Sequence, residues 1–232
     1  METTEKRRCC SVIFLVVFAS VLCGGRVNAV VPIPAKLDGF AYKNKLVHPG
    51  AIVIEAFFDP VCPDSRDAWP PLKQALQHYG DRVALTLHPF ALPYHDNAFV
   101  TSRALHIVNG LNKSATYDML ESFFLHQERF YNVNTKSKSK DDIVCELVDF
   151  VSDVVGKPYL PSVKSAFQDR KTDLLTRVSF KYACSRGVAE TPFFLINGFQ
   201  LATNDLIKYE GWRNILDPLI KMHREEIQYP WV

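Results

Sequence analysis

The feature that most constrains this 232-residue chain is an apolar run that leads to a cysteine followed by proline. Residues 51–58 are rich in β-branched and aromatic side chains, which is the composition of a buried strand. Cys62 and Pro63 follow, in a segment where proline suits the first helical position and acids suit the first turn. The sequence therefore predicts a strand that passes into a helix, with one thiol at the junction.

The next part of the chain reads as one strand and then a long helical region. The pattern predicts a strand over 83–88 and helices over the ranges 97–108, 114–128, 141–155 and 161–185. In the last range, Leu174, Val178 and Tyr182 recur at four-residue spacing and predict its buried face. The polar, lysine-rich residues 132–140 predict a solvated loop, with a basic binding patch as the alternative.

Strand character returns near the C-terminus. Asn197-Gly198 separates two short apolar segments, and this dipeptide favours the positive φ angles of a tight type I′ hairpin. Capping residues at 203–205 predict a final helix that ends near residue 222. A strand–helix–strand unit requires a right-handed crossover and gives a parallel pair, which the hairpin would extend antiparallel. The predicted fold class is therefore α/β, interrupted by a helical insertion.

The first 29 residues have the organisation of a signal peptide. Basic residues 6–8 precede an apolar run over 11–23, and small residues at 27–29 suit a signal peptidase. A retained signal anchor is the alternative, but the run is short for a membrane span of ~20 residues. We expect cleavage after Ala29 and no stable membrane association afterwards. The mature protein would be secreted or lie in the lumen of the endoplasmic reticulum, and the C-terminus has no retention signal.

The charge of the chain argues against a nucleic-acid partner. The formal net charge is +2, from 27 basic and 25 acidic residues. Removing the four basic and two acidic residues of 1–29 leaves 23 of each. A formally neutral chain has no large electrostatic surface for nucleic acid or for an anionic membrane.

Three cysteines remain once the leader is removed: Cys62, Cys145 and Cys184. An odd number in an oxidising compartment leaves at least one free thiol. Cys145 and Cys184 lie in predicted helices and would form a structural disulfide, and the alternative is that one of them resolves a bond made by Cys62. Asn112 begins an Asn-Lys-Ser sequon and is a candidate glycosylation site.

Two motifs carry a resemblance to a known family. Residues 57–63, Phe-Phe-Asp-Pro-Val-Cys-Pro, resemble the segment that joins strand to active site in the thioredoxin superfamily. Residues 191–198, Thr-Pro-Phe-Phe-Leu-Ile-Asn-Gly, look like the cis-proline loop and hairpin of its DsbA-like thiol–disulfide oxidoreductase branch. The resemblance implies a thioredoxin-like domain formed by 30–96 and 187–232, with an all-helical subdomain, 97–186, inserted into it.

The same resemblance implies roles for the residues of these motifs. Cys62 would be the nucleophile, and Thr191 with a cis Pro192 would dock an extended substrate next to the thiol, with Pro63 and Asp64 beside it. The helix N-terminus favours a thiolate, whereas Asp59 and Asp64 oppose it by like-charge repulsion.

The chain also departs from the family pattern. The family's redox motif is Cys-x-x-Cys, and here the fourth position is Ser65, whose hydroxyl would donate to the sulfur but is no resolving thiol. The acid often found under the family's cysteine falls on Ala56, with Glu55 one residue early and on the other strand face. His95 lies in the loop after the second strand, either as a base near the thiol or as a turn residue.

Three functional hypotheses follow. The first is a monothiol thiol–disulfide oxidoreductase or isomerase that acts through Cys62 on protein or small-molecule thiols and disulfides. It would need no cofactor or metal, and glutathione would be its co-substrate, because the mixed disulfide must be resolved from outside. The second is a redox-inactive protein that binds peptides in the manner of a chaperone. The third is a glutathione-dependent isomerase or transferase of small molecules, which the cysteine at the reactive position disfavours.

Overall fold

A computed structural model describes residues 33–44, 50–202 and 205–228, and for 223–228 the backbone alone. From Pro34 onwards the chain forms one compact unit. The predicted signal peptide and two of the predicted capping residues, 203 and 204, lie outside the described residues. Within the described part, no helix has both the length and the apolar character needed to cross a membrane.

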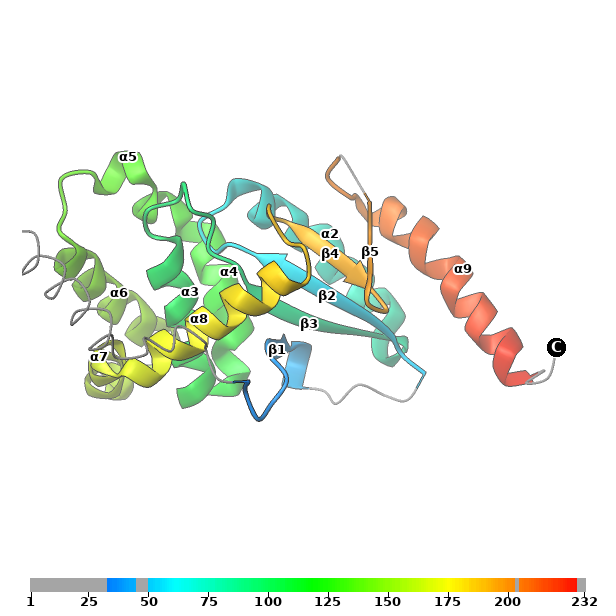
Figure 1. Cartoon of the computed structure of the whole chain (residues 1–232), viewed down its shortest axis with the longest axis horizontal. Helices are drawn as coiled ribbons and strands as arrows, with labels where there is room; N and C mark the ends of the chain where they lie inside the picture. Colours follow the sequence, from blue (N-terminus) through cyan, green and yellow to red (C-terminus); the bar gives the residue numbers. More distant parts are fainter. Residues whose placement is uncertain (1–32, 45–49, 203–204, 229–232) are drawn as a thin grey trace, which may run out of the picture. The chain divides into compact units, whose positions relative to one another are not determined.

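A mixed five-stranded sheet lies at the centre of this unit, in the order β1-β3-β2-β4-β5 (Figure 1). Strands β2 and β3 are parallel, β4 is antiparallel to β2, and β5 is antiparallel to β4. Strands β2 to β5 confirm the sequence prediction, whereas the short edge strand β1 was not predicted. The strands span Phe40–Ala41, Ile52–Phe58, Val83–Pro89, Phe193–Ile196 and Phe199–Gln200.

The turn between β4 and β5 has the expected geometry. Asn197 has φ 49° and Gly198 has φ 83°, the two positive angles that a type I′ turn requires. The Asn197 side chain also accepts a hydrogen bond from the backbone N–H of Val53, at 2.8 Å. The turn is thereby tied to β2 at the start of that strand.

Helices cover both faces of the sheet and also form a group to one side of it (Figure 1). Helices α2 and α9 pack on the face that carries Ile54, Ala56 and Phe58, whereas α8 packs on the face that carries Phe57. The helices are α2 Pro63–Tyr79, α3 Ala98–Leu111, α4 Thr116–His126, α5 Asn132–Thr135, α6 Lys140–Val155, α7 Leu160–Gln168, α8 Arg170–Ser185 and α9 Tyr209–Gln228.

The predicted helix over 161–185 is wrong, because the chain breaks it in two. Asp169 is extended and caps α8 by accepting a hydrogen bond from the N–H of Lys171, at 2.8 Å. The predicted buried face of α8 is correct only in part. Leu174 is exposed and Val178 is half-buried, and of the three predicted residues Tyr182 packs against the sheet. The fully buried residues of α8 are small or polar: Thr176, Ser179 and Ala183.

Two further boundaries differ from the prediction. The solvated loop expected over 132–140 contains the short helix α5, and a capping box between Ser139 and Asp142 starts α6. Helix α9 begins at Tyr209, later than the capping residues suggested, and runs to Gln228. The predicted division into 30–96 with 187–232 and an inserted 97–186 stays a prediction, since the described core is continuous across it.

Candidate active site

Cys62 lies at the predicted junction of strand and helix. It is the extended residue before α2, its N–H donates to the carbonyl of Asp59, and its own carbonyl accepts from Arg66. The residue is 3% exposed and packs with Phe57, Phe193 and neighbouring apolar side chains on the α8 face of the sheet. The thiol is thus held in a tight apolar setting at the first turn of a helix.

The thiol contacts the Thr191-Pro192 corner, which lies 129 residues away in the sequence. Its sulfur donates to the carbonyl oxygen of Thr191 at 3.5 Å. The Thr191-Pro192 peptide bond is cis, as the resemblance implied, and the corner leads directly into β4. The two motifs found in the sequence therefore meet in space.

Ser65 does not make the expected bond to the sulfur. It is fully buried on α2, and its hydroxyl oxygen accepts a hydrogen bond from the N–H of Asp59 at 3.2 Å. Among the described residues, the hydroxyl has no hydrogen bond with Cys62. In this geometry Ser65 anchors the end of β2 to the first turn of α2.

Asp59 is a central residue of the site, whereas the sequence indicated only that its charge would oppose a thiolate at Cys62. Its side chain is 0% exposed. One carboxylate oxygen accepts from the N–H of Val61 at 2.9 Å, and the other accepts from the N–H of Leu92 at 3.1 Å and contacts Nδ1 of His95 at 2.9 Å. This carboxylate joins the loop that carries Cys62 to the loop after β3.

His95 is therefore placed at the site, as one of its two readings expected. Its side chain is 22% exposed, so the imidazole reaches solvent while its Nδ1 is held by Asp59. Its role as a base stays a prediction.

Gln127, from the turn after α4, supports the cysteine loop from the helical side. Its side-chain amide donates to the carbonyls of Pro60 and Cys62 at 3.3 and 3.2 Å, and its own oxygen accepts from the Tyr131 hydroxyl at 2.7 Å. The amide side chain is buried. The helical region thus holds the backbone on both sides of Val61, which local sequence patterns do not reveal.

A second polar cluster is buried under α8. His88 of β3 contacts Asp38 at 2.8 Å, and its Nε2 lies 3.4 Å from Glu55 without hydrogen-bond geometry. The hydroxyl of Ser179 donates to Asp38 at 2.6 Å, and that of Tyr182 donates to Glu55 at 2.5 Å. Ser179 and Tyr182 of α8 are therefore the hydroxyl partners of these two carboxylates.

The charges of this cluster stabilise one another. Burial opposes protonation of His88, but its contacts with Asp38 and Glu55 outweigh that effect and raise its pKa. The contact with His88 lowers the pKa of Glu55 against its partial burial. Burial raises the pKa of Tyr182 to about 12, and its bond to Glu55 adds to the shift.

Glu55 and Ala56 lie on opposite faces of β2, as expected. Ala56 is buried in the core under α2, whereas Glu55 faces α8. Phe57 lies on the same face as Glu55, stacks on the His88 ring with centroids 4.8 Å apart, and packs in the cluster that contains Cys62. The acid is thus committed to His88 and Tyr182.

The remaining cysteines do not pair. Cys145 and Cys184 are both free and exposed, so the expected disulfide is absent from the structure. Helix α6, which carries Cys145, packs on α3, α4 and α7, whereas α8, which carries Cys184, packs on α3, α7 and β3. Asn112 is exposed, which suits the sequon, and its glycosylation stays a prediction.

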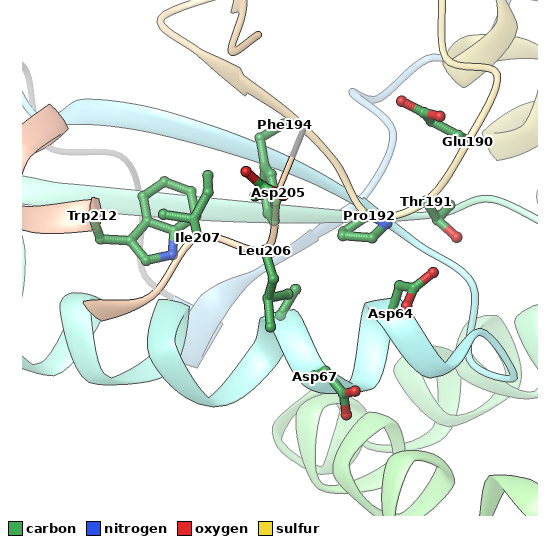
Figure 2. Close-up of a pocket in the computed structure, with 11 residues that line it drawn as sticks. Asp64, Asp67, Glu190, Thr191, Pro192, Phe194, Asp205, Leu206, Ile207 and Trp212 are labelled. Atoms are coloured by element: carbon green, nitrogen blue, oxygen red, sulfur yellow. The ribbon is translucent and has the colours of Figure 1, made fainter. Parts of the chain in front are cut away.

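A pocket of about 360 Å³ opens beside the Thr191-Pro192 corner (Figure 2). Pro192, Phe194 and Trp212 contribute to its apolar wall. Its charged lining residues are all acidic and come from α2, the loop before β4 and the loop before α9: Asp64, Asp67, Glu190 and Asp205. The resemblance placed Asp64 at a substrate site, and the structure adds the other three carboxylates.

Comparison with known proteins shows which fold this is. No protein-family profile and no curated protein matches the chain. Solved structures do match, and among them are DsbA-like thiol–disulfide oxidoreductases. The chain therefore has a DsbA-like thioredoxin fold with a helical insertion, as the motifs implied.

Three of these structures illustrate the likeness. The first, MdbA of Actinomyces oris, a thiol-disulfide oxidoreductase, has a TM-score of 0.61 at 18% identity over 84% of this chain and 93% of that one. The second, DsbA of Xylella fastidiosa, has a TM-score of 0.57 at 18% identity over 84% and 100%. The third, a protein from Pseudomonas syringae described as a protein-disulfide isomerase by inference, has a TM-score of 0.59 at 21% identity over 76% and 93%.

Proposed function

We propose that this protein exchanges thiols and disulfides through Cys62, using a single thiol. The observation that carries the proposal is the 3.5 Å contact between the Cys62 sulfur and the Thr191 carbonyl, beside cis Pro192. An extended chain docked along this corner would bring its own sulfur next to the thiol. The fold, shared with thiol–disulfide oxidoreductases, supports the same reaction class.

The exchange needs no group beyond the substrate and an external thiol. The Cys62 thiolate attacks one sulfur of a disulfide R–S–S–R′, the S–S bond breaks, and R′ leaves as a thiolate with the electron pair. A second thiolate, such as glutathione, then attacks the R sulfur of the mixed disulfide. R leaves joined to that thiol, and the Cys62 thiolate is restored.

An external thiol fits this chain because Ser65 stands where a resolving cysteine would be. Ser65 is buried and bonded to Asp59, and a hydroxyl does not displace a thiolate from a disulfide. Of the two other described cysteines, Cys184 follows Ala183 of the cluster that contains the sulfur and is the better candidate for an internal resolving thiol.

We place this chemistry in the secretory pathway, either in the endoplasmic reticulum or outside the cell. The signal-peptide pattern of residues 1–29 supports this location. Disulfides of substrates persist in these oxidising compartments, so a thiol-exchange protein has substrates there.

The second candidate function is peptide binding without redox turnover. The low exposure of Cys62, 3%, favours it, because a thiol must be reached by a disulfide before it can react. The two candidates share the groove at Thr191-Pro192 and differ only in whether the sulfur reacts.

A three-variant comparison tests the exchange reaction. Reduced glutathione and a glutathione disulfide that carries two self-quenching dyes report exchange as a gain of fluorescence. Cys145→Ser/Cys184→Ser keeps Cys62 alone and should retain the rate of the native chain if resolution is external. Adding Cys62→Ser should reduce the rate to that of the solution without protein. An unchanged rate in the variant without Cys62 would refute the proposal.

A further inference from the structure

The pocket beside the Thr191-Pro192 corner holds an unbalanced set of charges. Its carboxylates come from three separate segments of the chain, and none of its lining residues is basic. Asp67 is bonded to Arg66 at 2.7 Å, whereas Asp64 and Glu190 form no ion pair among the described residues. Figure 2 shows Asp64 and Glu190 on opposite sides of the corner.

Two buried polar atoms of the same pocket have no partner. Among the residues that the structure describes, neither the hydroxyl of Thr191, a residue 7% exposed, nor the indole nitrogen of Trp212, a residue 0% exposed, has a hydrogen-bond partner. Figure 2 shows the Thr191 hydroxyl on the side of Pro192 where Asp64 lies, and Trp212 at the other end of the pocket, beside Ile207. An unpaired buried polar group is costly, so each of these atoms points to a missing partner.

The chemistry of the lining excludes a simple metal site. An indole N–H donates hydrogen bonds and gives nothing to a cation. Among the residues that the structure describes, no group of three or more acidic, histidine or cysteine side chains has metal-binding geometry. The occupant must instead combine positive charge with hydrogen-bonding groups of its own.

A peptide with a basic side chain meets both conditions. The aliphatic stem of lysine or arginine packs on apolar surface while its charged end reaches carboxylates. The peptide backbone supplies carbonyl oxygens for the indole N–H and the threonine hydroxyl. A volume of about 360 Å³ lies within the range of pockets that hold small ligands and is ample for one such side chain.

We propose that this pocket selects substrates that carry a lysine or arginine side chain next to the reacting cysteine. The inference rests on the proposed function for its reacting cysteine, and it adds the substrate class. Docking at the corner would place the substrate's sulfur at Cys62 and its basic neighbour between Asp64 and Glu190. Acidic segments would be repelled by the same carboxylates.

Peptide binding without redox chemistry tests the proposal separately from the exchange reaction. The probes are ten-residue peptides in which serine replaces the cysteine. Each peptide carries lysine, norleucine or glutamate at one position, one or two residues before or after that serine. Their affinities are measured on Cys62→Ser protein by calorimetry. We expect the best lysine peptide to bind about 5- to 10-fold more tightly than its norleucine counterpart at low salt, and the preference to shrink at 0.5 M salt.

Variants of the pocket carboxylates show which residues cause the lysine preference. Asp64→Asn and Glu190→Gln should each reduce the lysine preference, and the double variant should bring it below about twofold. Asp149→Asn, at an exposed acid of α6 outside the pocket, is the matched control and should leave the preference unchanged. The peptide and salt series on Cys62→Ser alone carry the test if a pocket variant does not fold.

The outcomes separate the two proposals. Equal affinity for the lysine, norleucine and glutamate peptides, or no binding of any of them, would overturn this inference, whatever the exchange assay gives. A lysine preference that depends on Asp64 and Glu190 would support it, even in a protein whose Cys62 proved unreactive.

Discussion

Two acid–histidine clusters beside the sheet differ in their access to solvent. Asp59 holds His95 beside the cysteine loop, and the His95 side chain is 22% exposed. Asp38 and Glu55 hold His88 under α8, and the His88 side chain is 2% exposed. The buried cluster of Asp38, Glu55 and His88 joins the sheet to α8, whereas the His95 imidazole reaches solvent beside the loop that carries Cys62. Burial, more than residue type, separates a structural pair from a candidate functional one.

A third histidine shows what the carboxylates contribute. His106 is buried, as His88 is, but its ring bonds to the hydroxyl of Ser179 at 2.9 Å. Burial lowers its pKa to about 4, while the pKa of His88 is raised. Two histidines that share the neighbourhood of Asp38 therefore have pKa values shifted in opposite directions.

The largest expected loss of stability comes from removing a carboxylate of the buried cluster formed by Asp38, Glu55 and His88. Asp38→Ala should lower the free energy of unfolding by about 3–5 kcal/mol, because His88 loses a partner in a buried site. Asp173→Ala, which removes an exposed ion pair with Arg177, is the control and should cost less than about 1 kcal/mol. Urea unfolding of both variants measures this. Similar losses in the two would contradict the assignment of the buried cluster to stability.

The second effect is a pH dependence that separates the two buried histidines. At pH 5 an unfolded imidazole is protonated, whereas His106, with a folded pKa of about 4, stays neutral. This group should therefore remove about 2 kcal/mol of stability between pH 8 and pH 5. His88 has the opposite sign, because its raised pKa contributes stability at low pH that is lost as pH rises through its folded value.

Unfolding of the native chain and of His106→Gln at a series of pH values isolates the contribution of His106 to the pH dependence of stability. The variant should keep more of its stability on acidification, with the difference growing below about pH 6.5. Parallel curves for the two proteins would contradict the lowered pKa of His106 in the folded state.

The smallest expected effect on stability comes from the solvent-accessible pair of Asp59 and His95. His95→Ala should change the free energy of unfolding by less than about 1 kcal/mol, since His95 is partly exposed and the buried Asp59 carboxylate keeps its two backbone hydrogen bonds. It should slow exchange at Cys62 by up to ~10²-fold, the lower end of what a positioned acid–base group contributes. Exchange rates of His95→Ala and His95→Gln across pH measure this. A loss of stability with an unchanged rate would place His95 with the structural histidines.

The elements that the sequence predicted are those with strong local signals. The strand before Cys62, the Asn197-Gly198 turn and the Thr191-Pro192 corner each depend on a few adjacent residues, and all three are present. The break at Asp169 was missed because the capping of α8 competes with a continuous helical pattern. The buried face of α8 was predicted only in part, because small and polar residues occupy much of it and Ser179 bonds to the buried Asp38 carboxylate.

From the sequence, the main predicted parts of the site were the residues of the two motifs. Cys62 and Thr191 were identified from the sequence, and their contact follows from the fold. Gln127 lies 65 residues from Cys62, and a lone glutamine in a helical stretch gives no sign of such a role. The acidic pocket is formed by residues from three distant segments, so its charge appears only when the chain is folded.

The reactivity of one sulfur tests this account most directly. The Cys145→Ser/Cys184→Ser protein, with Cys62 as its remaining thiol after loss of the leader, is incubated with oxidised glutathione and followed by intact-protein mass spectrometry. The account predicts one glutathione adduct per native molecule, formed with single-exponential kinetics and absent from the variant that also carries Cys62→Ser. A native protein that acquires the adduct only after denaturation would contradict it.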